Sequence, residues 1–282
     1  MKTPHRPLPC QPSPLFAAML TAGVLFGSPL FAATNAPSSK LYVSDLKGQA
    51  DLSTADAVTP LTKKTVFSAQ GATVRTAKDS NDTMVYSNGS GIYLDADTLV
   101  KIKKFVQEPF TPNRYDLDVE PSISQTIAYV SHGVVGLCTS RLVGGSNMVY
   151  TTPQATLDIR GKRLVIEVNN SETRVSVLDG DVTVQASGNG AGQILHGGQE
   201  AIIRSDVANN TNNIVHVGPI PDDRKKFLDD RASLACIGRH TVYFEVVDSK
   251  SDSGDTQDIQ ATQVVPTGKP TDFTISPSQL SP

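Results

Sequence analysis

Short runs of alternating apolar and polar residues, broken by Gly, Asn and Asp, fill the chain from Lys40 to Ile214. In one of these runs Met84 and Tyr86 precede the pair Asn88-Gly89. A period of two places apolar side chains on one face of a strand, and Asn-Gly or Asp-Gly tolerates the positive φ that tight hairpin turns need. The pattern therefore predicts an all-β fold of short strands joined by tight turns.

A faint internal repeat is visible within this region. Residues 72–102 can be laid over residues 155–185, because both segments open with Ala-Thr-aliphatic and carry alternating runs at similar places. One supersecondary unit used twice, or a stack of strand rungs, gives such a pattern, while chance similarity between two strand-rich segments is the alternative. We expect a β-solenoid-like stack, or a flattened β-roll or sandwich.

Three segments depart from the alternating pattern. Residues 107–124 carry three prolines, and because proline cannot donate a ladder hydrogen bond this segment is predicted to be a connector or an edge crossing, not a central strand. Residues Pro221–Ile237 begin with acids and place apolar residues on one face, which predicts one short helix before a final strand at Thr241–Val247. The polar composition of residues 248–282 predicts a disordered tail.

The first 36 residues have the layout of a secretory signal peptide. Lys2 and Arg6 precede an apolar run from Leu15 to Ala33 that ends among small residues. An uncleaved anchor is the alternative, since the run approaches the length of a membrane span. Cleavage predicts a periplasmic or secreted protein with no membrane span. We divide the chain into the signal peptide (1–36), a first β-unit with the connector (37–125), a second β-unit (126–217), the helix and final strand (218–247) and the tail (248–282).

Charge and composition argue against one class of partner. The 282 residues include 25 Lys and Arg against 28 Asp and Glu, for a formal net charge of -3. Nothing in the sequence supplies the clustered Lys/Arg field that binding to nucleic-acid phosphates requires. Nucleic acid is therefore not an expected partner.

Two cysteines, Cys138 and Cys236, follow the predicted signal peptide. Thiols in an oxidising compartment tend to end as disulfides, so we expect these two residues to be paired. The alternative is a pair of buried, unpaired thiols that behave as small apolar residues.

Candidate catalytic and metal-binding groups are sparse. Asp116, Asp118 and Glu120 are spaced two residues apart, so in a strand they would share one face, as an acid/base pair or a calcium site would require. The surrounding sequence does not have the spacing of a calcium-binding loop. A solvated strand face is therefore the preferred interpretation. The histidines after the signal peptide are scattered singly, without zinc-site spacing: His132, His196, His216 and His240. We expect no catalytic residue, metal or cofactor.

The main catalytic alternative is a secreted β-helical carbohydrate-active enzyme, because that architecture also stacks short strands and is exported. Such enzymes usually need aromatic platforms for sugar rings and a long groove of acids and bases. The chain has no Trp and 7 Tyr. We therefore keep this function as the alternative to a binding protein.

A series of short motifs stands between Thr151 and Ile203. They are a Thr-Pro-x-Ala segment, an aliphatic-Arg-Gly corner, a strand, a Val-x-Val-x-x-Gly-x-Val hairpin and a later Leu-x-x-Gly-Gln. In this order they resemble the core of the FecR-domain family of bacterial extracytoplasmic proteins. The residues that carry the resemblance are Thr152, Pro153, Ala155, Arg160, Gly161, Gly180, Gly198 and Gln199.

Structural roles are expected for these motif residues. Pro153 can begin a strand without donating a hydrogen bond, and Gly161 permits a tight corner where a side chain would clash. Arg160 is expected to hydrogen-bond carbonyls of the corner or a neighbouring acid, with ligand binding as the alternative. Lys162 departs from the family pattern, which usually has Thr at this place.

The resemblance implies a non-catalytic protein that binds an envelope protein or a glycan, with a role in extracytoplasmic sensing, signalling or surface assembly. Regulators that resemble FecR carry a cytoplasmic sigma-factor-binding segment and a membrane span before their periplasmic domain. Here the only apolar run begins at Leu15. Only the extracytoplasmic domain is therefore implied. Strand edges also offer a surface for self-association.

Overall fold

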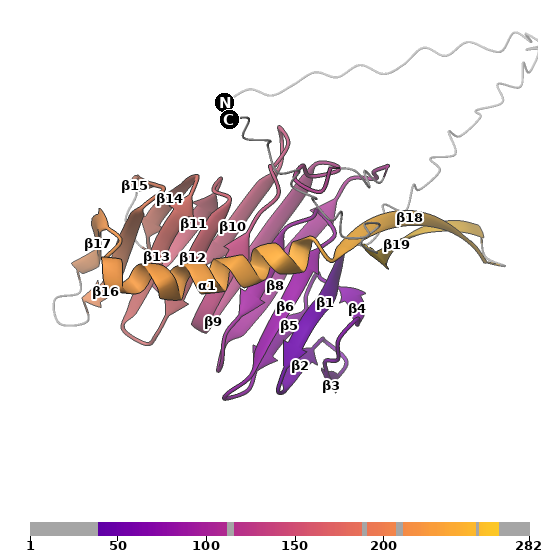
Figure 1. The fold of residues 1–282 in the computed structure, drawn as a ribbon, viewed down its shortest axis with the longest axis horizontal. Coiled ribbons are helices and arrows are strands. Elements are labelled where there is room, and N and C mark those ends of the chain that lie inside the picture. Colours follow the sequence, from indigo (N-terminus) through magenta and orange to yellow (C-terminus); the bar gives the residue numbers. More distant parts are fainter. Residues whose placement is uncertain (1–38, 112–115, 188–190, 207–210, 252–253, 265–282) are drawn as a thin grey trace, which may run out of the picture. The chain divides into compact units, whose positions relative to one another are not determined.

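A computed structural model describes residues 39–111, 116–187, 191–206, 211–251 and 254–264. These residues form β-strands and one α-helix, as the alternating pattern predicts (Figure 1). The predicted signal peptide (1–36) and residues 265–282 of the predicted tail lie outside the described residues.

One layer of the fold, layer A, is an antiparallel sheet that lies beneath the helix. Its strands, in spatial order, are β4 (Val66–Ser68), β1 (Lys40–Lys47), β6 (Asn81–Tyr86), β7 (Gly91–Leu94), the second half of β9 (Ser124–Cys138), β12 (Arg163–Val168), β13 (Glu172–Asp179), β16 (Gln199–Asp206) and β17 (Thr211–Pro219).

The other layer, layer B, contains the remaining strands of the large sheet. In spatial order they are β3 (Val58–Pro60), β2 (Ala50–Ser53), β5 (Thr73–Thr76), β8 (Leu99–Gln107), the first half of β9, β10 (Asn147–Thr151), β11 (Ala155–Ile159), β14 (Asp181–Ala186) and β15 (Gly192–His196). The pairing of β9 with β10 is parallel and the others are antiparallel.

Strand β9 passes from layer B to layer A at Gly133. Its first half pairs with β8 and its second half with β7 and β12. Gly133 has a φ of 98°, and a Cβ at this position would lie 2.2 Å from Oγ1 of Thr98. Only glycine fits such a bend, because it has neither the steric penalty at positive φ nor the side chain that would clash.

The main hydrophobic core lies between the two layers. Alternate residues point inward, as in β11, where Ala155, Leu157 and Ile159 are fully buried. Tyr86 from layer A and Tyr150 from layer B are also fully buried, and their hydroxyls lie 3.0 Å apart. Each hydroxyl thereby has a partner in a place that excludes water, which removes the cost of burying it alone.

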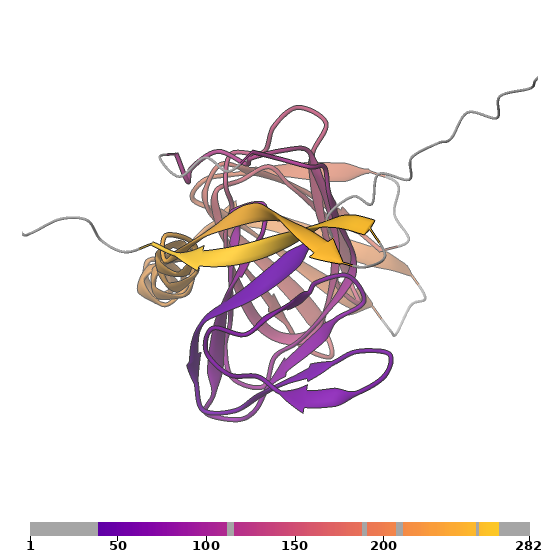
Figure 2. The same ribbon diagram turned by 90° about the vertical axis from the view of Figure 1, so that its right-hand side faces the viewer.

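The internal repeat is present in the structure as a repeated arrangement of four strands. In the first copy, β5 and β8 pair in layer B while β6 and β7 pair in layer A. In the second copy, β11 and β14 pair in layer B while β12 and β13 pair in layer A. The prediction of one unit used twice is confirmed, and the stack of units gives the flattened, two-layer arrangement (Figure 2).

The Arg-Gly corner of the second copy is a close contact between two turns. Gly180 has a φ of 89°, and a Cβ there would lie 2.4 Å from the Cα of Gly161. The backbone N–H groups on either side of Gly161 donate to the carbonyls of Asp181 and Asp179, at 3.0 and 2.9 Å. Two glycines are therefore needed, one for the positive φ and one for the close approach.

We predict that Gly180→Ala destabilises the protein more than Gly198→Ala. Both glycines have nearly the same φ, 89° and 88°, but a Cβ at Gly198 meets no atom within 4 Å. Alanine at Gly198 should cost about 1 to 2 kcal/mol for the left-handed backbone, whereas the added clash at Gly180 should bring the cost to about 3 kcal/mol or more. Urea denaturation of both variants measures this difference, and equal losses would contradict the account of the corner.

The helix, α1 (Asp222–Arg239), crosses the outer face of layer A (Figures 1 and 2). It was predicted at Pro221–Ile237. Asp222 and Asp223 occupy its first turn, where carboxylates interact favourably with the helix dipole. Leu228, Ala232 and Ala235 are fully buried on its inner face. The small residues of this face allow the helix to lie close to the sheet.

Glycines in the sheet permit this close approach. A Cβ at Gly91 would lie 2.1 Å from the carbonyl oxygen of Ala235, and a Cβ at Gly136 would lie 2.6 Å from that of Arg231. The predicted disulfide joins Cys138, at the end of β9, to Cys236 of the helix. The helix is therefore held on β7 and β9 by both packing and a covalent link.

Arginine side chains add ionic links between the helix and the sheet. Arg231 contacts Asp95 at 2.8 Å, and Arg163 of β12 contacts Asp229 at 2.5 Å. These side chains are only partly buried, so solvent screens each pair and its contribution to stability is modest. Their main effect is to fix the direction of the helix across the strands.

A two-stranded hairpin follows the helix and differs from what the sequence predicts. Strand β18 (Val242–Ser251) is longer than the predicted strand Thr241–Val247, and it pairs with β19 (Gly254–Gln263). Residues 254–263 lie in the segment predicted to be disordered, so that prediction is wrong for them. Their polar sequence does not have the alternating pattern from which a strand is predicted. The buried residue Ile259 of this strand packs with Phe244 against the outer face of layer A.

Candidate binding cleft

The Thr-Pro-x-Ala segment forms the turn between β10 and β11. Thr152 is buried, and its Oγ1 accepts a hydrogen bond from the N–H of Ala155 at 2.9 Å. Pro153 is exposed, while Gln154 is buried and its side-chain oxygen accepts a hydrogen bond from the Thr173 hydroxyl at 2.7 Å. These contacts hold the turn against the neighbouring hairpin and present no open binding surface.

The remaining motif residues lie in turns at the other ends of β11 and β13, away from the Thr-Pro-x-Ala turn. Arg160 is largely exposed, and its ionic contact is with Asp158 at 3.7 Å. The sequence predicts either carbonyls of the corner or a neighbouring acid as its partner, and the structure shows the acid. Gly198 donates its N–H to the carbonyl of Val177, and the side-chain oxygen of Gln199 accepts the N–H of His196. The first of these hydrogen bonds joins the turn to β13, and the second lies within the turn.

The histidines do not come together into one site. His196 contacts Asp181 at 2.7 Å and His132 lies 3.9 Å from Asp97, with all four side chains at least one-third exposed. His216 is in β17 and His240 follows the helix. Within the described ranges, the structure contains no group of three or more His, Cys, Asp or Glu that could hold a metal ion.

The three acids of the connector have different environments. Asp116 and Asp118 are exposed, but Glu120 is buried, so the interpretation of all three as a solvated strand face is wrong. Glu120 accepts hydrogen bonds from the Ser124 hydroxyl, the Asn88 amide and the N–H of Val143. Burial raises the pKa of Glu120, which these hydrogen bonds oppose. The carboxyl group anchors the connector to the sheet edge.

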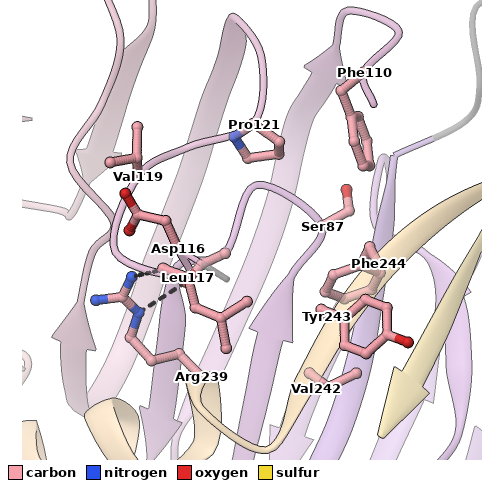
Figure 3. Close-up of a pocket in the computed structure, with 11 residues that line it drawn as sticks. Ser87, Phe110, Asp116, Leu117, Val119, Pro121, Arg239, Val242, Tyr243 and Phe244 are labelled. Carbon is pink, nitrogen blue, oxygen red and sulfur yellow. Dashed lines mark hydrogen bonds between the residues drawn. The ribbon is translucent and has the colours of Figure 1, made fainter. Parts of the chain in front are cut away.

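The anchored connector forms a cleft with the end of the helix and the start of β18 (Figure 3). One part of the cleft is an apolar cavity of about 30 Å³, room for a small aliphatic group. Its principal lining residues are Phe110, Leu117, Pro121, Val242, Tyr243 and Phe244. The other part is a polar pocket of about 380 Å³. Its lining residues are Asp116, Asp118, Val119, Thr139, Arg141, Lys162 and Arg239.

Arg239, the last residue of the helix, lies between the two parts. Its side chain is 6% exposed, and its guanidinium donates to the carbonyl oxygens of Gly89 and Leu117 (Figure 3) and to that of Thr139. It also pairs with Asp118 at 3.3 Å. Burial lowers the pKa of Arg239, while Asp118 and Asp116 oppose that shift. Arg239 thus joins the helix, the sheet edge and the connector, and it shapes the cleft.

The apolar cavity lies at the free edge of β18. Val242, Tyr243 and Phe244 all line it, although consecutive side chains of a strand point to opposite faces. Three consecutive residues share one cavity when it lies along the strand edge. In the described part of the chain β18 pairs only with β19, so the backbone groups of Val242 and Phe244, which face its other edge, have no partner strand there.

Sequence reasoning did not identify this cleft. Lys162 stood out only as a departure from a family pattern, and Arg239 and Arg141 carried no motif. Arg239 is brought to the connector by the helix, and Thr139 by its position next to Cys138. The disulfide between Cys138 and Cys236 was the signal that could have placed the end of the helix beside this sheet edge.

Comparison with known proteins identifies the central part of the chain. The FecR protein family matches residues 72–183, which begin with the first repeated unit and end in the second. No protein with a curated description is significantly similar to the chain. None of the helices in the described ranges is long and apolar enough to span a membrane.

Solved structures also show similarity to the chain. Two crystal structures, at 2.50 and 1.65 Å resolution, of a "putative anti-sigma factor" from Parabacteroides distasonis ATCC 8503 each match with a TM-score of 0.40 and 16% sequence identity. Each match covers 55% of this chain and 62% of the other. The chain thus spans somewhat less than two thirds of that protein. The family match shows a FecR domain at residues 72–183 of this chain.

Proposed function

We propose that this protein is an exported, non-catalytic component of the bacterial envelope that binds a segment of another protein in the cleft beside β18. The observation that carries the proposal is the edge of β18 at Val242 and Phe244, which has no partner strand among the described residues and borders an apolar cavity. An extended peptide can add to such an edge through backbone hydrogen bonds while its side chains enter adjoining pockets. A signalling role in the envelope would use the same contact.

Export is supported by two separate features. The apolar run from Leu15 to Ala33, with small residues at its end, has the layout of a signal peptide. The Cys138–Cys236 disulfide is of the kind that persists in oxidising compartments such as the periplasm. A partner would therefore be met in the periplasm or outside the cell.

Binding without catalysis is supported by the way the polar groups of the cleft are used. Arg239 donates to three carbonyl oxygens and pairs with Asp118, and the buried carboxyl of Glu120 accepts hydrogen bonds from its surroundings. These contacts hold the walls of the cleft in place. A preformed cleft with a free strand edge suits recognition of an extended segment, since little ordering of the protein is then needed on binding.

We predict that Leu117→Asp weakens peptide binding at least tenfold, because it places a charge against the apolar cavity that a partner side chain would enter. The probe is an array of synthetic ten-residue peptides of varied sequence, incubated with the full protein purified after export. Dissociation constants for the bound peptides are then measured in solution. Circular dichroism checks that the variant keeps its fold.

Ile194→Asp is the matched control. Ile194 is 59% exposed on β15, an edge strand of layer B, so the same type of change is made on another sheet edge. Binding lost in Leu117→Asp and kept in Ile194→Asp supports the cleft. The reverse result would move the contact to the β15 edge, where self-association is the expected mode. A polysaccharide or peptidoglycan fragment that binds, where no peptide does, would replace the protein partner by a glycan, and its turnover would identify an enzyme.

A further inference from the structure

The polar pocket of the cleft holds two cationic side chains that the fold itself does not use. Arg141 and Lys162 are both exposed, and in the described structure their side chains make no hydrogen bond or ion pair. Each cation of this kind can bind an oxyanion without first breaking an existing contact. The third cation of the pocket, Arg239, is already engaged with backbone carbonyls and Asp118.

We propose that Arg141 and Lys162 bind a carboxylate of the partner segment that occupies the cleft. This inference rests on the proposed function and specifies the chemistry of the partner. The partner segment then has an apolar residue for the cavity beside β18 and, next to it, a carboxylate for the polar pocket. The two parts of the cleft adjoin each other, because Asp116, Val119 and Arg239 line both.

The backbone holds both cationic residues in fixed places. The N–H of Arg141 donates to the carbonyl of Asp118 at 2.8 Å, and its own carbonyl accepts the N–H of Glu120. Lys162 donates its N–H to Asp179 at 2.9 Å and accepts the N–H of Thr139 at 2.9 Å. Each residue is thus bonded to a neighbouring segment on its sheet edge. The backbone therefore needs no ordering when a carboxylate is bound between the two side chains, and only the side chains lose freedom.

The charges of the pocket favour an anion. Three cations and two acids line it, which leaves a surplus of one positive charge in a chain whose formal net charge is -3. Asp118 is paired with Arg239 at 3.3 Å and so offsets that guanidinium. The pocket volume of about 380 Å³ is ample for an Asp or Glu side chain or for the terminal carboxylate of a peptide.

The test uses the double variant Arg141→Glu/Lys162→Glu and peptides already shown to bind the unchanged protein. We expect the bound peptides to be enriched in an acidic residue beside an apolar one, and the double variant to bind them at least tenfold more weakly. Replacing the acidic residue of a peptide by its amide should have a similar effect on the unchanged protein. Comparing free with amidated peptide C-termini distinguishes a terminal carboxylate from a side-chain carboxylate.

The matched control is Lys47→Glu/Lys101→Glu, which makes the same change in net charge at exposed positions of β1 and β8 away from the pocket. This variant should bind within about twofold of the unchanged protein. Equal losses in both double variants would overturn the pocket in favour of a general charge effect. Binding that depends on Leu117 but not on Arg141, Lys162 or peptide acids would overturn this inference alone and leave the proposed function standing. A melting curve by circular dichroism confirms that each variant is folded.

Discussion

Removal of the disulfide, by replacing Cys138 and Cys236 together with alanine, should lower the free energy of unfolding by about 4 to 5 kcal/mol. The two residues are 98 positions apart, and in the chain-entropy model a cross-link that closes a loop of this length restricts the unfolded chain by about that amount. Urea denaturation of the oxidised protein and of the double variant measures the difference. We expect a lower midpoint for the variant.

The same change should also weaken binding in the cleft. Cys138 directly precedes Thr139, and Cys236 lies one helical turn before Arg239, so the disulfide holds together two residues that line the polar pocket. Reduction of the unchanged protein is the matching experiment, because it opens the same link without a substitution. A loss below about 1 kcal/mol in both cases, or two alkylatable thiols in the unreduced protein, would contradict this role.

Replacement of Asp82 by Asn should raise the free energy of unfolding at pH 7 by up to about 4 kcal/mol. Asp82 lies in β6 and is fully buried, and neither of its carboxylate oxygens has a hydrogen-bond partner among the described residues. Burial raises the pKa of Asp82 to about 8, and the nearby charge of Asp45 adds to this increase. The backbone N–H of Thr83 opposes the increase, although it does not form a hydrogen bond with the carboxylate. Folding at pH 7 therefore forces this carboxyl to take up a proton.

The sign of the pH dependence follows from this raised pKa. The protonated carboxyl favours the folded state fully below the pKa of the unfolded chain, near 3.8, and this contribution is lost as the pH rises toward 8. The stability of the unchanged protein should fall across this range, while that of Asp82→Asn should fall less. Asp51→Asn, at an exposed position of β2, is the control and should change little. Parallel curves for the unchanged protein and Asp82→Asn would contradict the buried, neutral carboxyl.

The part of the fold that depends on local pattern could be predicted from the sequence. The alternating runs, the turn glycines and the repeat of residues 72–102 at 155–185 correspond to the strands, corners and repeated units of the structure. Each of these features depends on neighbouring residues, because the period of a strand and the φ of a turn are local properties. The helix was predicted for the same reason, from its acidic start and apolar face.

The part that depends on contacts between distant segments could not be predicted in this way. Strand β19 has a polar sequence and exists because β18 pairs with it and Ile259 is buried against layer A. Glu120 was taken for a solvated acid because its partners, Asn88 and Val143, come from other turns. The cleft likewise forms where the connector, the end of the helix and β18 come together. The hydrophobic periodicity of the sequence does not indicate contacts between such distant segments.

Binding at the β18 edge is tested most directly by amide hydrogen exchange of the protein with and without a bound peptide from the array. The N–H of Val264 donates to the carbonyl of Thr241, so in the alternating ladder the amides of Val242 and Phe244 face the free edge. The account predicts that these two amides exchange more slowly when the peptide is bound. Unchanged exchange at Val242 and Phe244, with protection on another strand such as β15, would contradict it.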